Sequence, residues 1–340
     1  MDRYCRLPKA VICCTNSTVA PTDMCWFFSF LLFIFPRPPP APAPGSTRVK
    51  IRGSMSDRTG DRMSLRGLKG YTITVLGAGV MGTAVVSAIL NSEIDPFPKK
   101  IILCTNSPSA TLQETFKGHE AIEFSFGVED NNKAVSQADV LILGVKPYMC
   151  RQVYEQVSSS LTGRQLVISL LAGTTLGELS IFSPYVVRVM TNTPAKYGCG
   201  TAAISFSSEV TAEQQQLVKH LIDPIGLSVV IPEKNMDIAT SLIGSGPAFC
   251  LLMMESLIDG AVRMGMPFDV ARLSAAKVME GTAKMLLESG EHPAALKSKV
   301  CTPGGTTIGG LLKMEDGAIR STIARGVEEA ANISASFAKK

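Results

Sequence analysis

The sequence predicts an α/β fold in which a doubly wound sheet is followed by an all-α C-terminal domain. Three observations lead to this prediction. A strand-like run at residues 71–76 passes through a glycine-rich turn into a helical segment, and further apolar runs alternate with helical segments up to residue 231. From residue 235 onward, nearly every segment has helical periodicity. We therefore expect an N-terminal extension at 1–70, a sheet domain at 71–232 and a helical domain at 233–340.

The composition suits a globular protein that can bury two cores. The 340 residues are 46% hydrophobic and 18% charged. The first 70 residues hold 11 Lys and Arg against 4 Asp and Glu, so the rest of the chain holds 22 against 25. This slightly acidic body lacks the basic face that nucleic acid requires, and we expect no nucleic-acid partner.

The nine cysteines do not form a metal-binding pattern. Apart from Cys13-Cys14 they are scattered singly, and none is spaced with a histidine as zinc ligands are. We expect no metal site. Cysteines such as Cys150 and Cys250 are expected to be small buried apolar residues in a reducing compartment.

The extension at 1–70 contains an apolar run of 10 residues, 26–35, followed by a proline-rich segment. The run is too short to cross a membrane, which takes about 20 residues, and it makes a poor signal peptide. We expect no membrane association and a cytoplasmic location. Two interpretations remain open for the extension: a disordered tail or leader upstream of a start at Met55 or Met63, or an organelle-targeting segment. The second would place the protein in mitochondria.

The turn Gly77-Ala78-Gly79-Val80-Met81-Gly82 lies between a predicted strand, 71–76, and a predicted helix, 83–90. In a dinucleotide-binding turn of the Rossmann type, the first glycine permits the tight turn and the second lets the backbone approach the pyrophosphate. The third permits close packing of helix and strand. We therefore expect Gly77, Gly79, Val80, Met81 and Gly82 to bind a dinucleotide cofactor.

The second predicted strand, 101–104, ends in Thr105-Asn106-Ser107. An acidic residue here would bind a ribose 2′-hydroxyl and repel a 2′-phosphate, whereas hydroxyl and amide groups can donate hydrogen bonds to that phosphate. The sequence predicts a preference for NADPH, with NADH as the second cofactor. The alternative is that Thr105, Asn106 and Ser107 merely form a turn.

Three later apolar runs, 139–145, 166–171 and 185–190, are each followed by a polar or glycine-containing turn. Ligands of doubly wound sheets bind beyond the carboxyl ends of the strands. We expect these turns to line the nicotinamide half of the cleft, although each could be an ordinary loop. The cofactor residues expected in them are Val145, Lys146, Pro147, Ala172 and Asn192.

The helical domain is predicted to contain helices at 236–264, 267–289, 293–299, 306–314 and 319–337. Helices this long and apolar in so small a domain predict that another subunit buries part of their surface, so we expect at least a homodimer. The first helix contains Gly244-Ser245-Gly246-Pro247, which weakens a helix. It could be a kink that brings the Ser245 hydroxyl to the site, or a packing notch between helices.

The segment Thr302-Pro303-Gly304-Gly305-Thr306-Thr307 directly precedes a predicted helix. Its free backbone N–H groups and threonine hydroxyls can converge on a small anion. We therefore expect Thr302, Gly304, Gly305 and Thr306 to bind a substrate, with Ser245 as a further contact.

Five motifs together resemble pyrroline-5-carboxylate reductase: GAGVMG at 77–82, VKP at 145–147, MTNTP at 190–194, GSGPA at 244–248 and TPGGTT at 302–307. The resemblance covers residues 71 to about 335. It implies reduction of L-1-pyrroline-5-carboxylate to L-proline by NADPH or NADH, in interleaved dimers that often assemble further, as far as a decamer. It also implies an imine-facing hydroxyl at Thr307 and carboxylate contacts at Thr302 and around Gly305-Thr306. Gly82 replaces an alanine found in some members, which should not disturb binding.

The chemistry fits these residues. A cyclic imine that carries a carboxylate needs a carboxylate site, access to the nicotinamide and a group that hydrogen-bonds the nitrogen. A protonated imine already accepts hydride well, so the Thr307 hydroxyl can suffice without a strong acid.

Two other functions are alternatives to this one. A β-hydroxyacid dehydrogenase needs a helical lysine with an asparagine four residues later, and the segment 237–264 contains no lysine. A non-catalytic NADPH-binding regulator would have no use for the complete TPGGTT segment.

Overall fold

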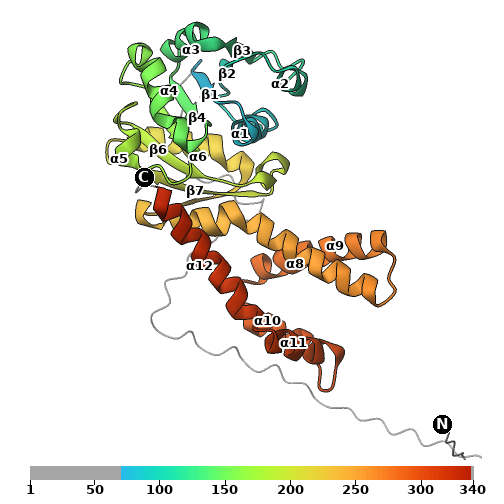
Figure 1. Cartoon of the computed structure of the whole chain (residues 1–340). Helices are drawn as coiled ribbons and strands as arrows, with labels where there is room; N and C mark the ends of the chain where they lie inside the picture. The colour runs from blue at the N-terminus through green and yellow to red at the C-terminus, as the bar shows by residue number, and fades with distance from the viewer. Residues whose placement is uncertain (1–69, 338–340) are drawn as a thin grey trace, which may run out of the picture. The chain divides into compact units, whose positions relative to one another are not determined.

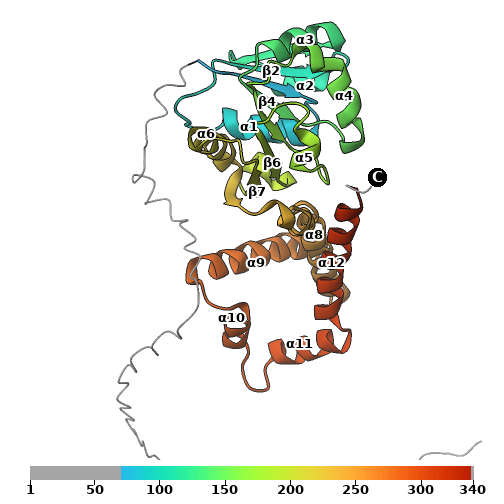
Figure 2. The same cartoon turned by 90° about the vertical axis from the view of Figure 1, so that its left-hand side faces the viewer.

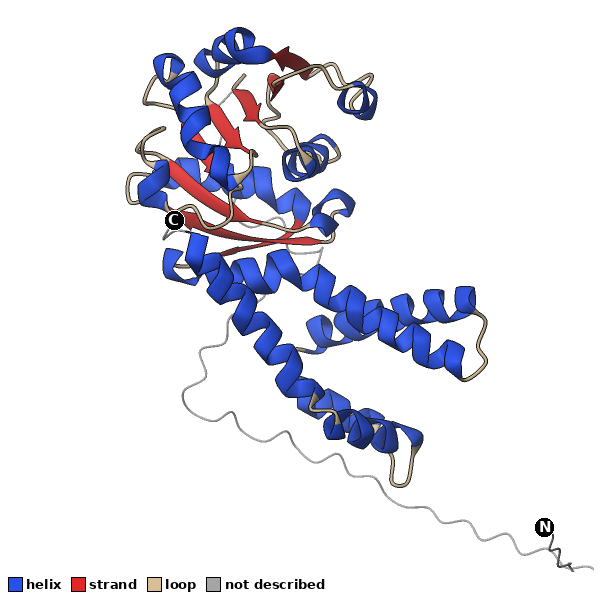
Figure 3. Cartoon of the chain, in the orientation of Figure 1, coloured by secondary structure: helices blue, strands red, loops and turns tan. Residues whose placement is uncertain are grey.

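The computed structural model describes residues 70–337, which form one eight-stranded sheet with flanking helices and then a helical region (Figure 1, Figure 3). The predicted fold class is confirmed. The extension, with its apolar run at 26–35, lies outside the described residues apart from Gly70.

The strands follow the order β3-β2-β1-β4-β5-β6-β7-β8, and all neighbouring pairs are parallel except β6 and β7. Strands β1 to β3 are placed in order toward one edge of the sheet, and β4 and the later strands toward the other edge. The switch point lies between the parallel neighbours β1 and β4, and doubly wound sheets bind ligands at such points. The strands are β1 (Thr72–Leu76), β2 (Lys100–Thr105), β3 (Ile122–Phe126), β4 (Val140–Leu143), β5 (Leu166–Ser169), β6 (Val186–Met190), β7 (Gly200–Phe206) and β8 (Gly226–Val230).

Two of these strands, β3 and β7, are absent from the sequence prediction. Strand β3 is at an edge of the sheet and is only partly buried, so its apolar pattern is weak. Strand β7 begins with Gly, Thr and two Ala residues, of which only Thr favours strands. Pairing with β6 on one side and β8 on the other makes it a strand.

Side chains alternate between the two faces along each strand, so apolar strands make both faces apolar. Helices cover both faces of the sheet. In β1, Ile73 and Val75 join the core beneath one layer of helices, and Leu76 joins the core beneath the other. The first layer is formed mainly by α1 (Val80–Leu90) and α6 (Ala212–Ile222), and the second by α3 (Gly127–Ser136), α4 (Cys150–Val157) and α5 (Leu176–Leu179). The short α2 (Ala110–Thr115) follows β2.

The helical region agrees closely with the predicted helix boundaries. It begins with a single 3-10 turn, η5 (Glu233–Asn235), and α7 (Met236–Ala239). A π-helical turn, η6 (Thr240–Ser245), then joins α7 to α8 (Gly246–Arg263). It continues through α9 (Phe268–Ser289), α10 (Pro293–Val300), α11 (Thr306–Asp316) and α12 (Ile319–Phe337). The predicted break at Gly244-Ser245 is therefore a widened helical turn.

The helical region buries few of its apolar side chains within one chain. Leu251, Leu273 and Leu287 are each more than 60% exposed, and α8 has no buried residue. In the described part of the chain, the helical stretch Glu233–Arg263 is long and apolar enough to cross a membrane by length and composition alone, with 6% of its apolar window buried. The same properties are typical of a helix that another subunit covers, and the absence of a membrane stays a prediction.

The burial expected of two cysteines is wrong for the single chain. Cys250 is exposed on α8, and Cys150 at the start of α4 is only half-buried. The sequence pattern shows that Cys250 lies in an apolar helix, but not whether that helix packs against its own chain.

Helix α12 is fastened to the start of the helical region by two buried serines. The Ser241 hydroxyl in η6 donates to the backbone carbonyl of Val327, and the Ser334 hydroxyl donates to Asp237 Oδ1 at 2.7 Å. Both serines are at most 2% exposed. These bonds join residues that are 86 and 97 positions apart in the chain.

We expect Ser334→Ala to lower the free energy of unfolding by about 1–3 kcal/mol, because the Asp237 carboxylate loses a buried donor. Urea denaturation measures the change. Ser336→Ala is the matched control, since the exposed Ser336 hydroxyl donates only to Ile333 on its own helix. Equal effects of the two substitutions would contradict this prediction.

Candidate active site

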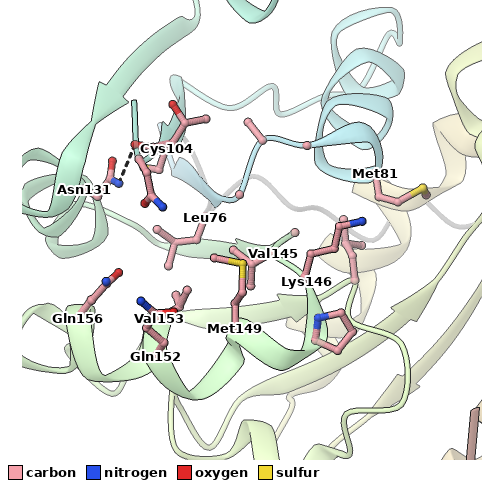
Figure 4. Close-up of a pocket in the computed structure, with 18 of the residues that line it drawn as sticks. Leu76, Met81, Cys104, Asn131, Val145, Lys146, Met149, Gln152, Val153 and Gln156 are labelled. Carbon is pink, nitrogen blue, oxygen red and sulfur yellow. Dashed lines mark hydrogen bonds between the residues drawn. The ribbon is translucent and has the colours of Figure 1, made fainter. Parts of the chain in front are cut away.

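A cavity of about 610 Å³ lies at the carboxyl ends of β1, β2, β4 and β5 (Figure 4). The segments that line it are the glycine turn, the end of β2, the first half of α3, the turn after β4 with α4, and the turn after β5. The lining residues are Leu76, Gly77, Ala78, Gly79, Val80, Met81, Cys104, Thr105, Asn106, Val128, Asn131, Gly144, Val145, Lys146, Pro147, Met149, Gln152, Val153, Gln156, Val157, Leu170 and Ala172. None is acidic, and Lys146 is the one charged residue among them.

The three glycines of the turn have three different environments. Gly77 has φ +89°, and a Cβ there would lie 2.7 Å from the backbone nitrogen of Val145. A Cβ on Gly82 would lie 2.8 Å from the Gly77 carbonyl oxygen. A Cβ on Gly79 would meet no atom within 4 Å, so this glycine faces open space. The tight turn and the close packing are as predicted, and Gly82 serves the packing without lining the cavity.

Helix α1 begins beside Gly79 with no side chain capping its first turn. Its first N–H groups, at Val80 and Met81, therefore lack a side-chain acceptor. Unpaired N–H groups at a helix N-terminus favour an anion, both by hydrogen bonding and through the helix dipole. This end of the cavity can hold a pyrophosphate.

At the end of β2, Thr105 and Asn106 line the cavity and Ser107 does not. The Thr105 hydroxyl donates to the carbonyl of Ser107 at 2.8 Å, so that hydroxyl serves the turn. The Asn131 side chain donates to the Thr105 carbonyl at 3.1 Å and accepts from the Ser125 hydroxyl at 2.8 Å. The buried Asn131 thereby fixes the end of β2 against α3 (Figure 4).

Sequence reasoning missed the contribution of α3 and α4. Asn131 comes from α3, and Met149, Gln152 and Gln156 come from α4 and the turn before it (Figure 4). Gln152 and Gln156 are four residues apart, so they lie on one face of α4. That spacing, directly after the turn at Lys146-Pro147, was the signal that could have revealed them.

Cys104 forms part of the apolar floor of the cavity. Burial raises the pKa of its thiol to about 12, so the thiol stays protonated at neutral pH. Cys104 is therefore an uncharged lining residue. Within residues 70–337, no three His, Cys, Asp or Glu side chains gather as a metal site.

Of the turns predicted to line the cavity, two do so. Val145, Lys146 and Pro147 follow β4, and Ala172 follows β5. Asn192, after β6, is not a lining residue. Its side-chain oxygen accepts a hydrogen bond from the Thr201 backbone at 3.2 Å, which ties the end of β6 to the start of β7.

Residues 302–305 form a compact turn in front of α11, and Thr306 and Thr307 are the first two residues of that helix. Gly304 has φ +66°, and the Gly305 N–H donates to the Thr302 carbonyl at 3.0 Å. No side chain caps the first turn of α11. Thr302 and Thr306 are exposed and Thr307 is half-buried. The N–H groups of the uncapped helix start and the hydroxyls of Thr302, Thr306 and Thr307 therefore lie within one short stretch of chain. We call residues 302–307 the α11 cradle.

Within one chain, the α11 cradle and the cavity are separate. None of residues 302–307 lines the cavity. The end of α12 lies at the turn after β5, since a Cβ on Gly173 would lie 2.7 Å from the Cβ of Phe337. The 19-residue helix α12 places its other end about 27 Å away, next to α11 (Figure 1, Figure 2).

Ser245 is also outside the lining set. It ends η6, where the neighbouring Gly244 approaches β6: a Cβ on Gly244 would lie 3.3 Å from the sulfur of Met190. Gly244 thus packs against a strand, whereas the predicted packing notch lay between two helices. A role of Ser245 in binding substrate stays a prediction.

A doubly wound sheet, a glycine turn at its switch point and an uncapped helix N-terminus define a dinucleotide-binding protein of the Rossmann type. Two family models match the chain. The model "NADP oxidoreductase coenzyme F420-dependent" matches residues 72–173, and the model "Pyrroline-5-carboxylate reductase dimerisation" matches residues 233–337.

Relatives and solved structures agree with the second model. The pyrroline-5-carboxylate reductase of Kluyveromyces lactis is 46% identical over 79% of this chain and 99% of its own length; that of Schizosaccharomyces pombe is 36% identical over 78% and 98%. The crystal structure of the Plasmodium falciparum enzyme with NADP bound has a TM-score of 0.71 at 26% identity, covering 79% of this chain and 99% of that one. The chain belongs to the pyrroline-5-carboxylate reductase family.

The glycine turn yields a prediction with an internal control. Gly77→Ala should lower the free energy of unfolding by more than about 2 kcal/mol, because it combines a positive φ with a backbone clash. Gly79→Ala should change stability by less than about 0.5 kcal/mol, since a Cβ there meets nothing in the protein.

The effect of Gly79→Ala should appear in cofactor binding instead. We expect its Kd for NADPH to rise about tenfold or more, because the methyl group occupies the space for the pyrophosphate. Thermal unfolding and a fluorescence titration with NADPH measure the two quantities. Wild-type NADPH affinity in Gly79→Ala would show that the phosphates do not approach this turn.

Proposed function

We propose that this protein reduces L-1-pyrroline-5-carboxylate to L-proline with a nicotinamide dinucleotide. The observation that carries the proposal is the α11 cradle, an uncapped helix N-terminus with threonine hydroxyls beside it, in a chain that also holds the cavity at the glycine turn. Membership of the pyrroline-5-carboxylate reductase family supports it.

The residues of the cavity suit the two halves of the cofactor. The backbone at Gly77, Gly79, Val80 and Met81 would hold the pyrophosphate. The adenosine half would lie toward Asn106 and the two α4 amides, Gln152 and Gln156, over the apolar floor. The nicotinamide half would lie toward Val145, Lys146, Pro147 and Ala172. When bound, the nicotinamide supplies a hydride to the imine carbon of the substrate.

The α11 cradle would bind and orient the substrate. The hydroxyl of Thr302 and the backbone around Gly305-Thr306 would hold its carboxylate, and Gly304 permits the turn that aims them. The Thr307 hydroxyl would accept a hydrogen bond from the protonated imine nitrogen. A positive nitrogen makes the adjacent carbon electrophilic without an acidic side chain, so orientation is the main task of these residues.

We propose that the cavity and the α11 cradle of one active site come from two copies of the chain. The separation within one chain and the exposed apolar faces of α8 and α9 support this arrangement. The matching dimerisation model supports oligomer formation. We propose a homodimer, which can assemble further, up to a decamer, and no nucleic-acid or membrane partner.

For the cofactor, we propose NADPH as the preferred form and NADH as the second. Two observations support this choice: the lining residues include no carboxylate, and the amide of Asn106 is available at the ribose-reading position. A carboxylate would repel the 2′-phosphate of NADPH.

We propose a cytoplasmic location, with mitochondria as the alternative if residues 1–70 act as a presequence. Microscopy of a C-terminal fluorescent fusion of the full chain, with organelle markers, tests this. A purely mitochondrial signal would contradict the first location.

The function is tested by incubating the purified full chain with L-1-pyrroline-5-carboxylate and either NADPH or NADH. We expect L-proline in both reactions and a higher kcat/KM with NADPH. Chromatographic detection of proline, alongside the loss of absorbance of the reduced cofactor, measures the reaction. The absence of proline with both cofactors would refute the function.

Thr307→Ala should lower kcat by about tenfold to a hundredfold and leave the Kd for NADPH unchanged, because only the imine nitrogen loses a partner. Thr307→Ser, which keeps the hydroxyl, should retain most of the activity. Thr115→Ala is the control, since that exposed threonine on α2 donates only to the Thr111 carbonyl. An unchanged kcat in Thr307→Ala would remove this residue from the mechanism.

A further inference from the structure

One carboxylate oxygen joins three parts of the molecule. Oε1 of Glu233, the first residue of η5, accepts a hydrogen bond from Nη1 of Arg188 on β6 at 3.1 Å. The same oxygen accepts from the backbone N–H of Leu176, the first residue of α5, at 2.6 Å. The start of the helical region is therefore tied to the sheet and to a helix N-terminus by a single atom.

The bond to Leu176 acts on a turn that lines the cofactor cavity. Residues 170–175 connect β5 to α5, and within the turn 171–175 Ala172 is a lining residue. At the α5 end, Thr175 and Glu178 form a capping box that fixes the helix start internally. Glu233 accepts a hydrogen bond from the same helix start, so the turn is also bonded to the first residue of the helical region.

The helical region also contacts this turn at a second point. Gly173 has φ +70°, and a Cβ there would lie 2.7 Å from the Cβ of Phe337 at the end of α12. The turn therefore meets the helical region at two residues, Glu233 and Phe337. Both residues belong to the segment 233–337 that matches the dimerisation model.

Stability alone does not account for the Arg188 and Glu233 pair. Arg188 is 4% exposed, and its Nε is buried without a hydrogen-bond partner in the described residues. Burying a guanidinium is costly, and apolar residues often replace a buried ion pair with no loss of stability. An incompletely bonded charge in the sheet indicates that the pair supplies geometry.

We infer that Glu233, held in place by Arg188, is a positioning residue that sets the nicotinamide end of the cofactor cavity through the Leu176 N–H and the turn 171–175. The inference rests on the proposed use of a nicotinamide cofactor. What the inference requires of residue 233 is a hydrogen-bond acceptor for the Leu176 N–H, held beside the sheet.

Two double variants isolate that acceptor. Arg188→Met with Glu233→Gln removes both charges and keeps an amide oxygen for the Leu176 N–H. Arg188→Met with Glu233→Leu also removes both charges and has no acceptor. Neither leaves an unpaired buried charge, so both should fold, and comparison of their thermal unfolding checks this.

The readout separates the two halves of the cofactor. We expect the Glu233→Leu double variant to bind NADPH about threefold to tenfold more weakly than the Glu233→Gln double variant, the effect of one lost hydrogen bond. Adenosine 2′,5′-bisphosphate occupies only the adenosine half, so its Kd should be equal in both. In steady-state assays, kcat should fall further in the Glu233→Leu double variant than in the Glu233→Gln double variant. Glu123→Gln, which breaks the 2.8 Å pair of Lys100 with Glu123 at the far edge of the sheet, should change none of these values.

Equal NADPH affinity in the two double variants would overturn the inference. Parallel weakening of NADPH and of the adenosine fragment would also overturn it, because general destabilisation affects both halves. The binding measurements need no substrate, so they test Glu233 even if the protein forms no proline. A wild-type protein that binds NADPH without making proline would refute the proposed function and leave this comparison intact.

Discussion

The close approach of two backbones at the switch point of the sheet is the constraint on which the rest of the site depends. A Cβ on Gly144 would lie 2.5 Å from the Gly77 carbonyl, and a Cβ on Gly82 would lie 2.8 Å from the same oxygen. Because three glycines meet there, the N-terminus of α1 and the turn after β4 open onto one cavity. Any side chain at this point would push the pyrophosphate end away from the nicotinamide end.

Apart from the Lys146 ammonium, the polar groups of the site are backbone N–H groups, side-chain amides and hydroxyls. This suits a substrate that is already activated by its own protonated nitrogen, since the protein then needs to orient it and to hold its carboxylate. The helical region leaves apolar faces exposed within one chain. Such faces favour association with a second copy, and in the proposed arrangement that association completes the active site.

Sequence reasoning succeeded where the information is local. The glycine turn, most strand ends and the helix boundaries follow from periodicity and from Gly and Pro positions. It missed β7, which begins with small residues and pairs with β6 on one side and β8 on the other. Asn131, Gln152 and Gln156 were missed because α3 and α4 reach the cavity through tertiary packing. The separation of the α11 cradle from the cavity could not be predicted either, since it depends on the direction of α12.

The central claim is that the cavity of one copy works with the α11 cradle of another, and mixing two inactive variants tests it most directly. Gly79→Ala impairs the cavity and Thr307→Ala impairs the cradle, so each alone should have little activity at limiting cofactor. When the two variants are co-expressed and pair at random, about half of the dimers contain one copy of each. One of the two active sites in such a mixed dimer has an intact cavity and an intact cradle, so about a quarter of the wild-type activity should return. Activity no higher than the average of the two parent variants would contradict the account.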